Sequence, residues 1–429
     1  MRLINITVGG FRNVDDTDIR LGGIVGFVST NNYGKSNLLE GIKFAFQFIA
    51  AGQQDREIMM RDVRNIPLVP SLENKPFRFQ VEFDSEVEGP YRFVRYGFSF
   101  LWAKDDGSGA RIVSETLFAN PKASGIFSLY LDREKKKYRA SHKTRSFRKI
   151  APQSSQLALD ALSALGEVEL IDVVKRIKSL KFNLASDSDI DARARFVPSI
   201  FELIPSLKEW LNDIPTQLLY LKEHQFEQYR LFEEGVYALF PEFEAISVEV
   251  FRNEFKQKLN LHQEREKPLP FQFKDDVVKL MVKSSYLNQV VDIQHMSAGT
   301  KRVVWLLANA ILTSSRQGQK ILAIEEIETS IHPRLIEELL EQLNENLGNS
   351  TLLVTSYSPY WVQYLKPNKI YVGLPNENGC ACFKPLDAGK FKDFAKRAHD
   401  RGLGFGEYLY SLMSGSDDGV RVLRKYLQA

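Results

Sequence analysis

The residues with the clearest chemistry lie in one loop near the N-terminus, Ser29-Thr30-Asn31-Asn32-Tyr33-Gly34-Lys35-Ser36-Asn37. A turn that ends in Gly-Lys-Ser directly before a helix is typical of a phosphate-binding loop, whose backbone amides point at phosphate oxygens. In such a loop, Lys35 would contact the β- and γ-phosphates and the Ser36 hydroxyl would hold Mg²⁺. Ser29 stands where the pattern usually has its first glycine, so we expect a slightly altered turn.

The segments on both sides of this loop have the hydrophobic patterns of the strand and the helix that a phosphate-binding loop connects. Residues 24–28 form an apolar run that predicts a buried strand. After the loop, apolar side chains recur at helical spacing: Leu38, Leu39, Ile42, Phe46 and Ile49. Because strand, loop and helix occur in the expected order, a chance Gly-Lys-Ser in an ordinary turn is the weaker interpretation.

Two carboxylates, Glu325 and Glu326, directly follow a second apolar run at 321–324. One acid at a strand end can hold Mg²⁺ through water, and the next can act as general base toward an attacking water. Two surface glutamates at a strand end are the weaker interpretation even in isolation, and the phosphate-binding loop weakens it further. His332 follows shortly afterwards, and a structural and a functional histidine are equally good interpretations of it.

Two further segments could face a nucleotide. Ser297-Ala298-Gly299-Thr300 precedes an apolar helix, and a Ser-x-Gly turn at a helix N-terminus can bind an anion, although the pattern is weak alone. Thr355-Ser356-Tyr357-Ser358-Pro359 follows an apolar strand at 351–354.

Length and composition limit the class of protein. The chain has 429 residues with 44% hydrophobic content and a formal net charge of +3, which suits two or three globular domains. No apolar run approaches the roughly 18 residues needed to span a membrane, and the start of the chain has the pattern of a strand rather than of a signal peptide. With Cys380 and Cys382 interpreted as reduced thiols, the sequence predicts a cytoplasmic protein without a membrane partner.

The spacing of apolar residues changes along the sequence and divides the chain into three parts. Residues 1–150 should form an N-terminal lobe with the phosphate loop and an antiparallel sheet, 151–240 a helical insertion, and 241–429 a C-terminal lobe. Residues 133–149 carry nine Lys or Arg side chains and one acid, with aromatics between them. This segment is either a contact for a nucleic-acid backbone or a solvated loop.

Taken in chain order, these motifs resemble the ABC-type ATPases of the SMC, RecF and OLD branch. The matching pieces are Phe11-Arg12 after the first strand, the phosphate loop, Ser297 to Thr300, Ile324 to Glu328 with Ser330 to Pro333, and Thr355 to Pro359. The resemblance implies an α/β fold, namely an ABC-type P-loop ATPase head with a mixed central sheet, an antiparallel β-subdomain and a helical insertion. It also implies ATP and Mg²⁺ as cofactors.

The resemblance assigns roles to individual residues. Two heads would dimerise head to tail around ATP, with Ser297 and Gly299 of one copy touching the γ-phosphate held by Lys35 of the other. Glu325 would be the acid on the magnesium side and Glu326 the catalytic base. Ser330 to His332 would communicate across the dimer. The nucleotide would be bound by Arg12, Asn31, Asn32, Tyr33, Gly34, Lys35, Ser36 and Asn37.

Tyr357 stands where this branch usually has a histidine in Thr-Ser-His-Ser-Pro. Tyrosine can donate a hydrogen bond but stays neutral near pH 7, since its unperturbed pKa is about 10. It cannot supply a partly protonated imidazole. We therefore expect slow hydrolysis and a long-lived ATP-bound dimer.

The resemblance leaves several functions open. OLD-type nucleases carry a TOPRIM domain with an Asp-x-Asp pair, and the residues after Pro359 contain none. The motifs are therefore more similar to stand-alone ATPase subunits of anti-phage systems such as Septu and PARIS, which would control a separate effector nuclease. The alternative is a RecF- or SMC-like repair ATPase that clamps DNA, and a transporter ATPase comes last. All of them require the two ends of the chain to fold into one head.

Overall fold

The computed structural model describes residues 2–67, 69–85, 91–122, 126–141, 143–165, 169–185, 213–253, 275–315, 319–374, 378–414 and 417–428. The chain divides into two compact units. Unit 1 comprises Met1–Leu184, Arg316–Glu328 and Leu347–Ala429, and unit 2 comprises Ala185–Ser315 and Thr329–Asn346. Each is described by itself below.

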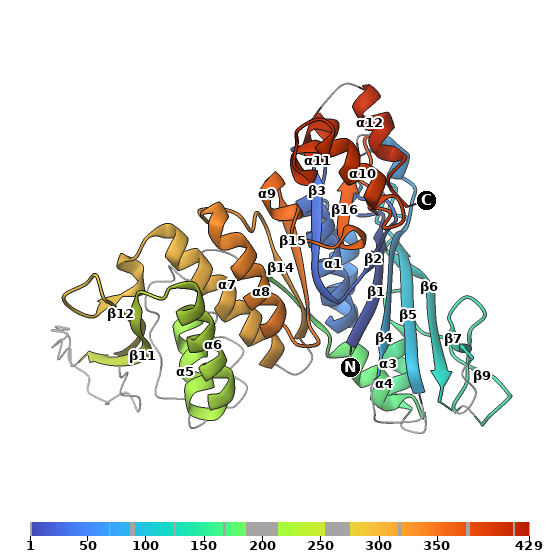
Figure 1. Cartoon of the computed structure of the whole chain (residues 1–429). Coiled ribbons are helices and arrows are strands. Elements are labelled where there is room, and N and C mark those ends of the chain that lie inside the picture. Colours follow the sequence, from blue (N-terminus) through green and yellow to red (C-terminus); the bar gives the residue numbers. More distant parts are fainter. Residues whose placement is uncertain are drawn as a thin grey trace, which may run out of the picture. The chain divides into compact units, whose positions relative to one another are not determined.

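A mixed six-stranded sheet in unit 1 joins the two ends of the chain. Its order is β10 (Lys181–Ala185), β14 (Gln319–Ile324), β15 (Thr351–Ser356), β3 (Gly23–Ser29), β16 (Ile370–Gly373) and β17 (Phe383–Pro385). The N-terminal strand β3 pairs in parallel with β15 on one side and with β16 on the other (Figure 1). Lys35 and Glu326 therefore belong to one compact body, as the nucleotide-site hypothesis requires.

The second sheet of unit 1 is antiparallel and has eight strands. Its order is β2 (Thr17–Arg20), β1 (Arg2–Gly9), β4 (Phe77–Asp84), β5 (Tyr91–Leu101), β6 (Arg111–Pro121), β7 (Ser128–Asp132), β8 (Lys137–Tyr138) and β9 (Arg148–Lys149). Alternation in β4 buries every second side chain, which covers one face with aromatics. This is the antiparallel sheet expected from the strand periods.

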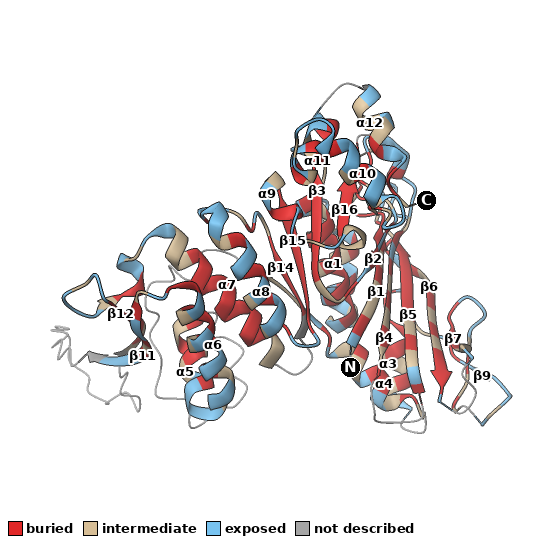
Figure 2. Cartoon of the chain, viewed as in Figure 1, coloured by how far each residue is buried: buried red, intermediate tan, exposed pale blue. Residues whose placement is uncertain are grey.

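Helix α1 (Lys35–Ala50) and strands of both sheets contribute buried residues to one apolar core. Figure 2 colours the buried residues of these elements red. Phe48 stacks on Phe98 and Phe100 of β5, with ring centroids 5.1 and 4.9 Å away. Leu38 and Leu39 in the first turns are fully buried. This packing anchors the helix whose N-terminus carries the phosphate loop.

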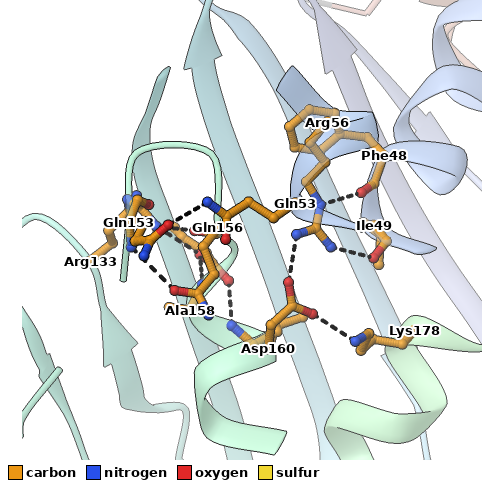
Figure 3. A network of polar contacts seen from close by, with 12 residues as sticks. Phe48, Ile49, Gln53, Arg56, Arg133, Gln153, Gln156, Ala158, Asp160 and Lys178 are labelled. Atoms are coloured by element: carbon orange, nitrogen blue, oxygen red, sulfur yellow. Dashed lines mark hydrogen bonds and ion pairs between the residues drawn. The ribbon is translucent and has the colours of Figure 1, made fainter. Parts of the chain in front are cut away.

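The C-terminal end of α1 is held by a buried arginine of helix α2 (Gln53–Arg61). Arg56 is fully buried, and its guanidinium donates to the carbonyl oxygens of Phe48 and Ile49 at 2.8 and 3.2 Å (Figure 3). Asp160 accepts from Arg56 at 2.5 Å and from Lys178 at 2.6 Å. Since a buried charge requires a partner, this network ties α1 to helices α3 (Ala158–Ala164) and α4 (Ile171–Lys178).

Four C-terminal helices complete unit 1: α9 (Pro359–Val362), α10 (Phe391–His399), α11 (Phe405–Ser414) and α12 (Asp417–Arg424). They form a second apolar cluster around Phe394, Tyr408 and Leu409, which also includes Val28 of β3 and Val372 of β16. The cluster therefore packs on strands of the six-stranded sheet.

Unit 2 contains helices α5 (Ile214–His224), α6 (Phe226–Leu239), α7 (Ala298–Ser315) and α8 (Ile336–Asn346). Its small antiparallel sheet has the order β11 (Phe243–Asn253), β12 (Asp275–Ser284) and β13 (Val291–Asp292). None of the helices in the described part of the chain combines the length and apolar character needed to span a bilayer.

These units differ from the three parts expected from the sequence. The expected helical insertion at 151–240 is divided, because α3 and α4 pack in unit 1 whereas α5 and α6 pack with α7 and α8 in unit 2. Residues 186–212 of that insertion lie outside the described residues. Local helical period could not reveal this division, because the partners of α3 and α4 in unit 1, such as Arg56 beside Asp160, lie far away in the sequence.

Candidate nucleotide site

The phosphate loop runs from the end of β3 to the start of α1. Gly34 has φ 124°, and a Cβ there would lie 2.8 Å from both Ala381 Cβ and Asn13 Oδ1. Only glycine fits this conformation and space. Among the described residues, no side chain caps the N-terminus of α1. Its first amides can therefore donate to an anion.

The Lys35 side chain is buried and fully engaged in this structure. Its ammonium group lies 2.9 Å from Ser29 O, 3.1 Å from Ser29 Oγ and 3.4 Å from Thr30 O. The ring of Tyr357 covers it, with 3.6 Å from Nζ to the ring centroid. Burial lowers the pKa of Lys35 to about 8, and the charges of Glu328 and Glu326 oppose that shift.

A chain of hydrogen bonds braces the loop from the side of β1. Arg12 donates to Asn37 Oδ1 at 2.9 Å and to the carbonyl oxygen of Arg64 at 2.9 Å. Asn37 donates to Asn13 Oδ1 at 2.8 Å, and Asn13 donates to the Tyr33 carbonyl at 2.9 Å. Arg12 thus connects with the first turn of α1, next to the phosphate loop.

The other predicted loop residues divide into inward and outward side chains. The Tyr33 hydroxyl donates to the Leu374 carbonyl at 2.5 Å and accepts from Cys382 N at 3.2 Å, so its side chain is directed into unit 1. Burial raises the pKa of Tyr33 to about 12. Asn31, Asn32 and Ser36 are exposed and are available to a ligand.

The acids after β14 lie in a strained turn beside β15. Glu326 has φ 47°, which is uncommon for a residue other than glycine, and its backbone amide donates to Thr355 Oγ1 at 3.1 Å. Glu325 is half-buried and Glu326 is exposed. Strain of this kind clusters at functional sites.

Glu328 anchors the segment that carries Tyr357. Its Oε1 accepts from the Tyr357 amide at 2.6 Å, while Oε2 is buried without a hydrogen-bond partner among the described residues. Burial raises the pKa of Tyr357, and the three nearby glutamates raise it further, so the phenol stays neutral. Lys35, Tyr357 and the glutamates after β14 therefore lie close together at the phosphate loop of unit 1.

The donor set fits ATP with Mg²⁺. Positive charge from Lys35 and open helix amides suit phosphates, whereas the Ser36 hydroxyl and the Glu325 carboxylate are oxygen ligands of the kind that Mg²⁺ takes. Within the described residues, no cluster of three or more His, Cys, Asp or Glu side chains could hold a metal ion.

The other residues that the sequence predicts for the nucleotide site, Ser297, Gly299 and His332, lie in unit 2. Ser297 is exposed at the start of α7, where its Oγ accepts from Thr300 N at 3.1 Å. A Cβ at Gly299 would lie 2.6 Å from the Ser330 carbonyl oxygen, so this turn and the Ser330 segment pack closely. The exposed His332 accepts from Arg334 N at 3.3 Å.

The comparison with protein families agrees with this geometry. The family described as "AAA domain, putative AbiEii toxin, Type IV TA system" matches residues 30–362. The chain belongs to this AAA-domain family. No curated protein matches it significantly. The expected α/β P-loop ATPase head, with mixed sheet, antiparallel sheet and helical part, is confirmed for this AAA-domain ATPase.

Three of the solved structures that are similar to this ATPase are SMC heads. One is bound to the C-winged helix domain of ScpA, with 15% identity, TM-score 0.49, and coverage of 91% of this chain and 100% of the other. A head from Thermotoga maritima has 12% identity, TM-score 0.44, and coverage of 90% and 100%. A third head, which has an extended coiled coil, is bound to the C-terminal domain of ScpA from Pyrococcus furiosus. It has 12% identity and a TM-score of 0.48, and the match covers 93% of this chain and 99% of the other. Because every identity is at most 15% and every TM-score is below 0.5, this structural similarity adds no evidence to the family assignment.

The sequence analysis missed one residue of this site and gave three others no contact role. Asn13, which it did not name, donates to the Tyr33 carbonyl of the loop. Ser29, Glu328 and Thr355 lie in motifs that it quoted, and they contact Lys35, Tyr357 and Glu326 respectively. Their positions were visible in the sequence, but these partners were not, because folding brings them together.

Proposed function

We propose that this AAA-domain ATPase binds ATP with Mg²⁺, hydrolyses it slowly, and dimerises head to tail around the nucleotide. The single observation that carries the proposal is the meeting of Lys35, Tyr357 and the glutamates beside an uncapped helix N-terminus. Measuring ATP hydrolysis by the purified chain, with and without Mg²⁺, tests it. A chain that neither binds nor hydrolyses ATP would contradict it.

In the proposed reaction, Lys35 and the loop amides hold the phosphates in line with an attacking water. Glu326 accepts the proton of that water as its oxygen bonds to the γ-phosphorus, and ADP leaves with the bridging oxygen. Bound Mg²⁺ would neutralise charge on the β- and γ-phosphates, with Ser36 and Glu325 on its side of the site. Arg12, Asn31, Asn32, Gly34 and Asn37 would shape the loop around the nucleotide.

The dimer gives a role to the residues of unit 2. The exposed Ser297 and the close-packed Gly299 would contact the γ-phosphate of a second copy, and His332 would lie at the same interface. Analytical ultracentrifugation should therefore detect a dimer with ATP and a monomer with ADP or no nucleotide. Ser297→Arg, which adds bulk and charge at this turn, should leave the protein monomeric with ATP.

The neutral Tyr357 supports slow turnover. Replacing it by histidine supplies a group that titrates near pH 6.5 and can exchange a proton with the γ-phosphate region. We expect Tyr357→His to raise the hydrolysis rate by about 10-fold at pH 7. The parent rate should stay flat between pH 6 and pH 8, because the raised pKa of Tyr357 keeps the phenol protonated there. Rapid turnover by the parent chain, with no gain from histidine, would disprove the role of Tyr357.

The biological role that we propose is regulation of a separate effector nuclease in anti-phage defence. The description of the family as a TA system supports a chain that acts together with a separate partner. Co-purification of a tagged chain from its native host tests this, with a nuclease as the expected partner.

The alternative function, an ATP-dependent DNA clamp, is favoured by one surface. Six Lys or Arg side chains are exposed among the described residues of 133–149, a segment that includes the β8–β9 hairpin. The centroid of the exposed Phe147 ring lies 4.3 Å from Lys137 Nζ and 4.9 Å from Arg139 Cζ. The exposed cations are Lys135, Lys136, Lys143, Arg145, Arg148 and Lys149. Such a surface suits a phosphate backbone.

Changing Lys143, Arg145 and Lys149 to glutamine tests this alternative. If the hairpin binds DNA, the slope of log affinity against log salt should become shallower by about 2–3. The matched control removes three exposed lysines near the C-terminus: Lys392, Lys396 and Lys425. Equal losses in both triple variants would indicate a general charge effect, not a binding surface.

A further inference from the structure

Helix α11 holds the backbone of the segment that carries Tyr357. The Tyr410 hydroxyl donates to the carbonyl oxygen of Ser356 at 3.1 Å. Burial raises the pKa of Tyr410, so this hydroxyl keeps its proton and remains a donor. The bond joins a C-terminal helix to the residue directly before Tyr357.

A second contact from the same helix fixes the other end of the segment. At the start of α11, a Cβ on Gly406 would overlap the carbonyl oxygen of Pro359, so the helix backbone lies directly against it. Between these contacts, Ser356 Oγ accepts from Ser358 N at 2.9 Å and closes a tight turn. Residues 356–359 are thus held at both ends by α11.

On its opposite side, the segment reaches the nucleotide site. The Tyr357 amide donates to Glu328, and the ring covers the Lys35 ammonium at 3.6 Å. That ammonium has three N–H bonds and lies near three acceptor oxygens of Ser29 and Thr30. A phosphate oxygen must therefore displace existing contacts of Lys35 before it can bind.

We infer that Tyr410 is a positioning residue for the nucleotide site: its hydrogen bond to Ser356 keeps the Tyr357 ring over Lys35 while nucleotide is absent. The inference rests on the proposed function, since it requires Lys35 to bind phosphate. A change that loosens residues 356–359 should weaken the contact between the Tyr357 ring and the Lys35 ammonium, which competes with phosphate for Lys35. Nucleotide binding should then become tighter.

The variant Tyr410→Phe removes one oxygen and retains the ring. We expect the Kd of ADP, measured by calorimetry, to fall by about 2- to 5-fold, which is within the strength of one cation–π contact. ADP is used because ATP would also drive dimerisation, and that second equilibrium would change the measured Kd. The matched control is Tyr426→Phe, which removes a hydroxyl that donates to Asp393 at 2.6 Å in the same helical cluster. The control should leave the Kd unchanged.

A double-mutant cycle separates positioning from a structural role. Tyr357→Ala should tighten ADP binding by itself, and Tyr410→Phe should add nothing in that background. An unchanged or weaker affinity in either single variant overturns the inference, as does an equal gain from Tyr410→Phe in both backgrounds. If the parent chain binds neither ADP nor ATP, the proposed function fails and the inference falls with it. If the parent binds and only the cycle fails, the proposed function stands.

Discussion

Glu326→Gln is expected to lower the rate of ATP hydrolysis by about 10²- to 10⁴-fold, the usual contribution of a general base. The amide keeps the shape of the carboxylate but cannot take the proton of the attacking water. The strained turn at Glu326 is held by the hydrogen bond from its backbone amide to Thr355 Oγ1, which the substitution does not alter. ATP affinity should therefore be nearly unchanged, and the ATP-bound dimer should accumulate. Single-turnover kinetics and ultracentrifugation with ATP measure both effects.

Glu328→Gln is the matched control for this variant. Its amide oxygen can still accept from the Tyr357 amide, which is the contact of the native carboxylate. We expect less than about a 10-fold loss in rate, since Glu328 positions a segment and does not take the proton. A larger loss from Glu328→Gln than from Glu326→Gln would transfer the role of base to Glu328.

Lys35→Met should weaken ADP binding by about 10- to 100-fold, because it removes a charged donor worth about 1.5–3 kcal/mol. Hydrolysis should become undetectable, since the γ-phosphate loses the same partner. The apolar replacement nearly matches the length of the buried stem, so the variant should fold. The control is Lys43→Met on the same helix, whose side chain pairs with Glu40 at 3.4 Å and is about one-third exposed. It should leave ADP affinity unchanged.

The pH dependence gives a second test of Lys35. Its pKa of about 8 without nucleotide should rise when phosphates bind beside it. ADP affinity should therefore be constant below pH 8 and decline as the pH rises above 8, where the free protein has lost the charge. Lys35→Met should lack this decline. A parent profile that stays level up to pH 9.5 would show that Lys35 does not bind the phosphates.

The sequence by itself determined the local elements of the site. Gly-Lys-Ser between an apolar strand and a helical run specified the loop, since the required turn, charge and hydroxyl are properties of adjacent residues. The alternation of β4 and the acids after β14 were visible for the same reason. Period and spacing carry this information because they depend on neighbours along the chain.

Only the tertiary structure decided which of these elements meet. The insertion of β3 between β15 and β16 joins residues more than 300 positions apart, and it depends on strand register and packing. The same is true of the inward Tyr33 side chain, of the Tyr357 ring over Lys35, and of the Tyr410 bond to Ser356. Such contacts have no local signature, because a hydroxyl or ring shows its chemistry in the sequence but not the partner that folding brings to it.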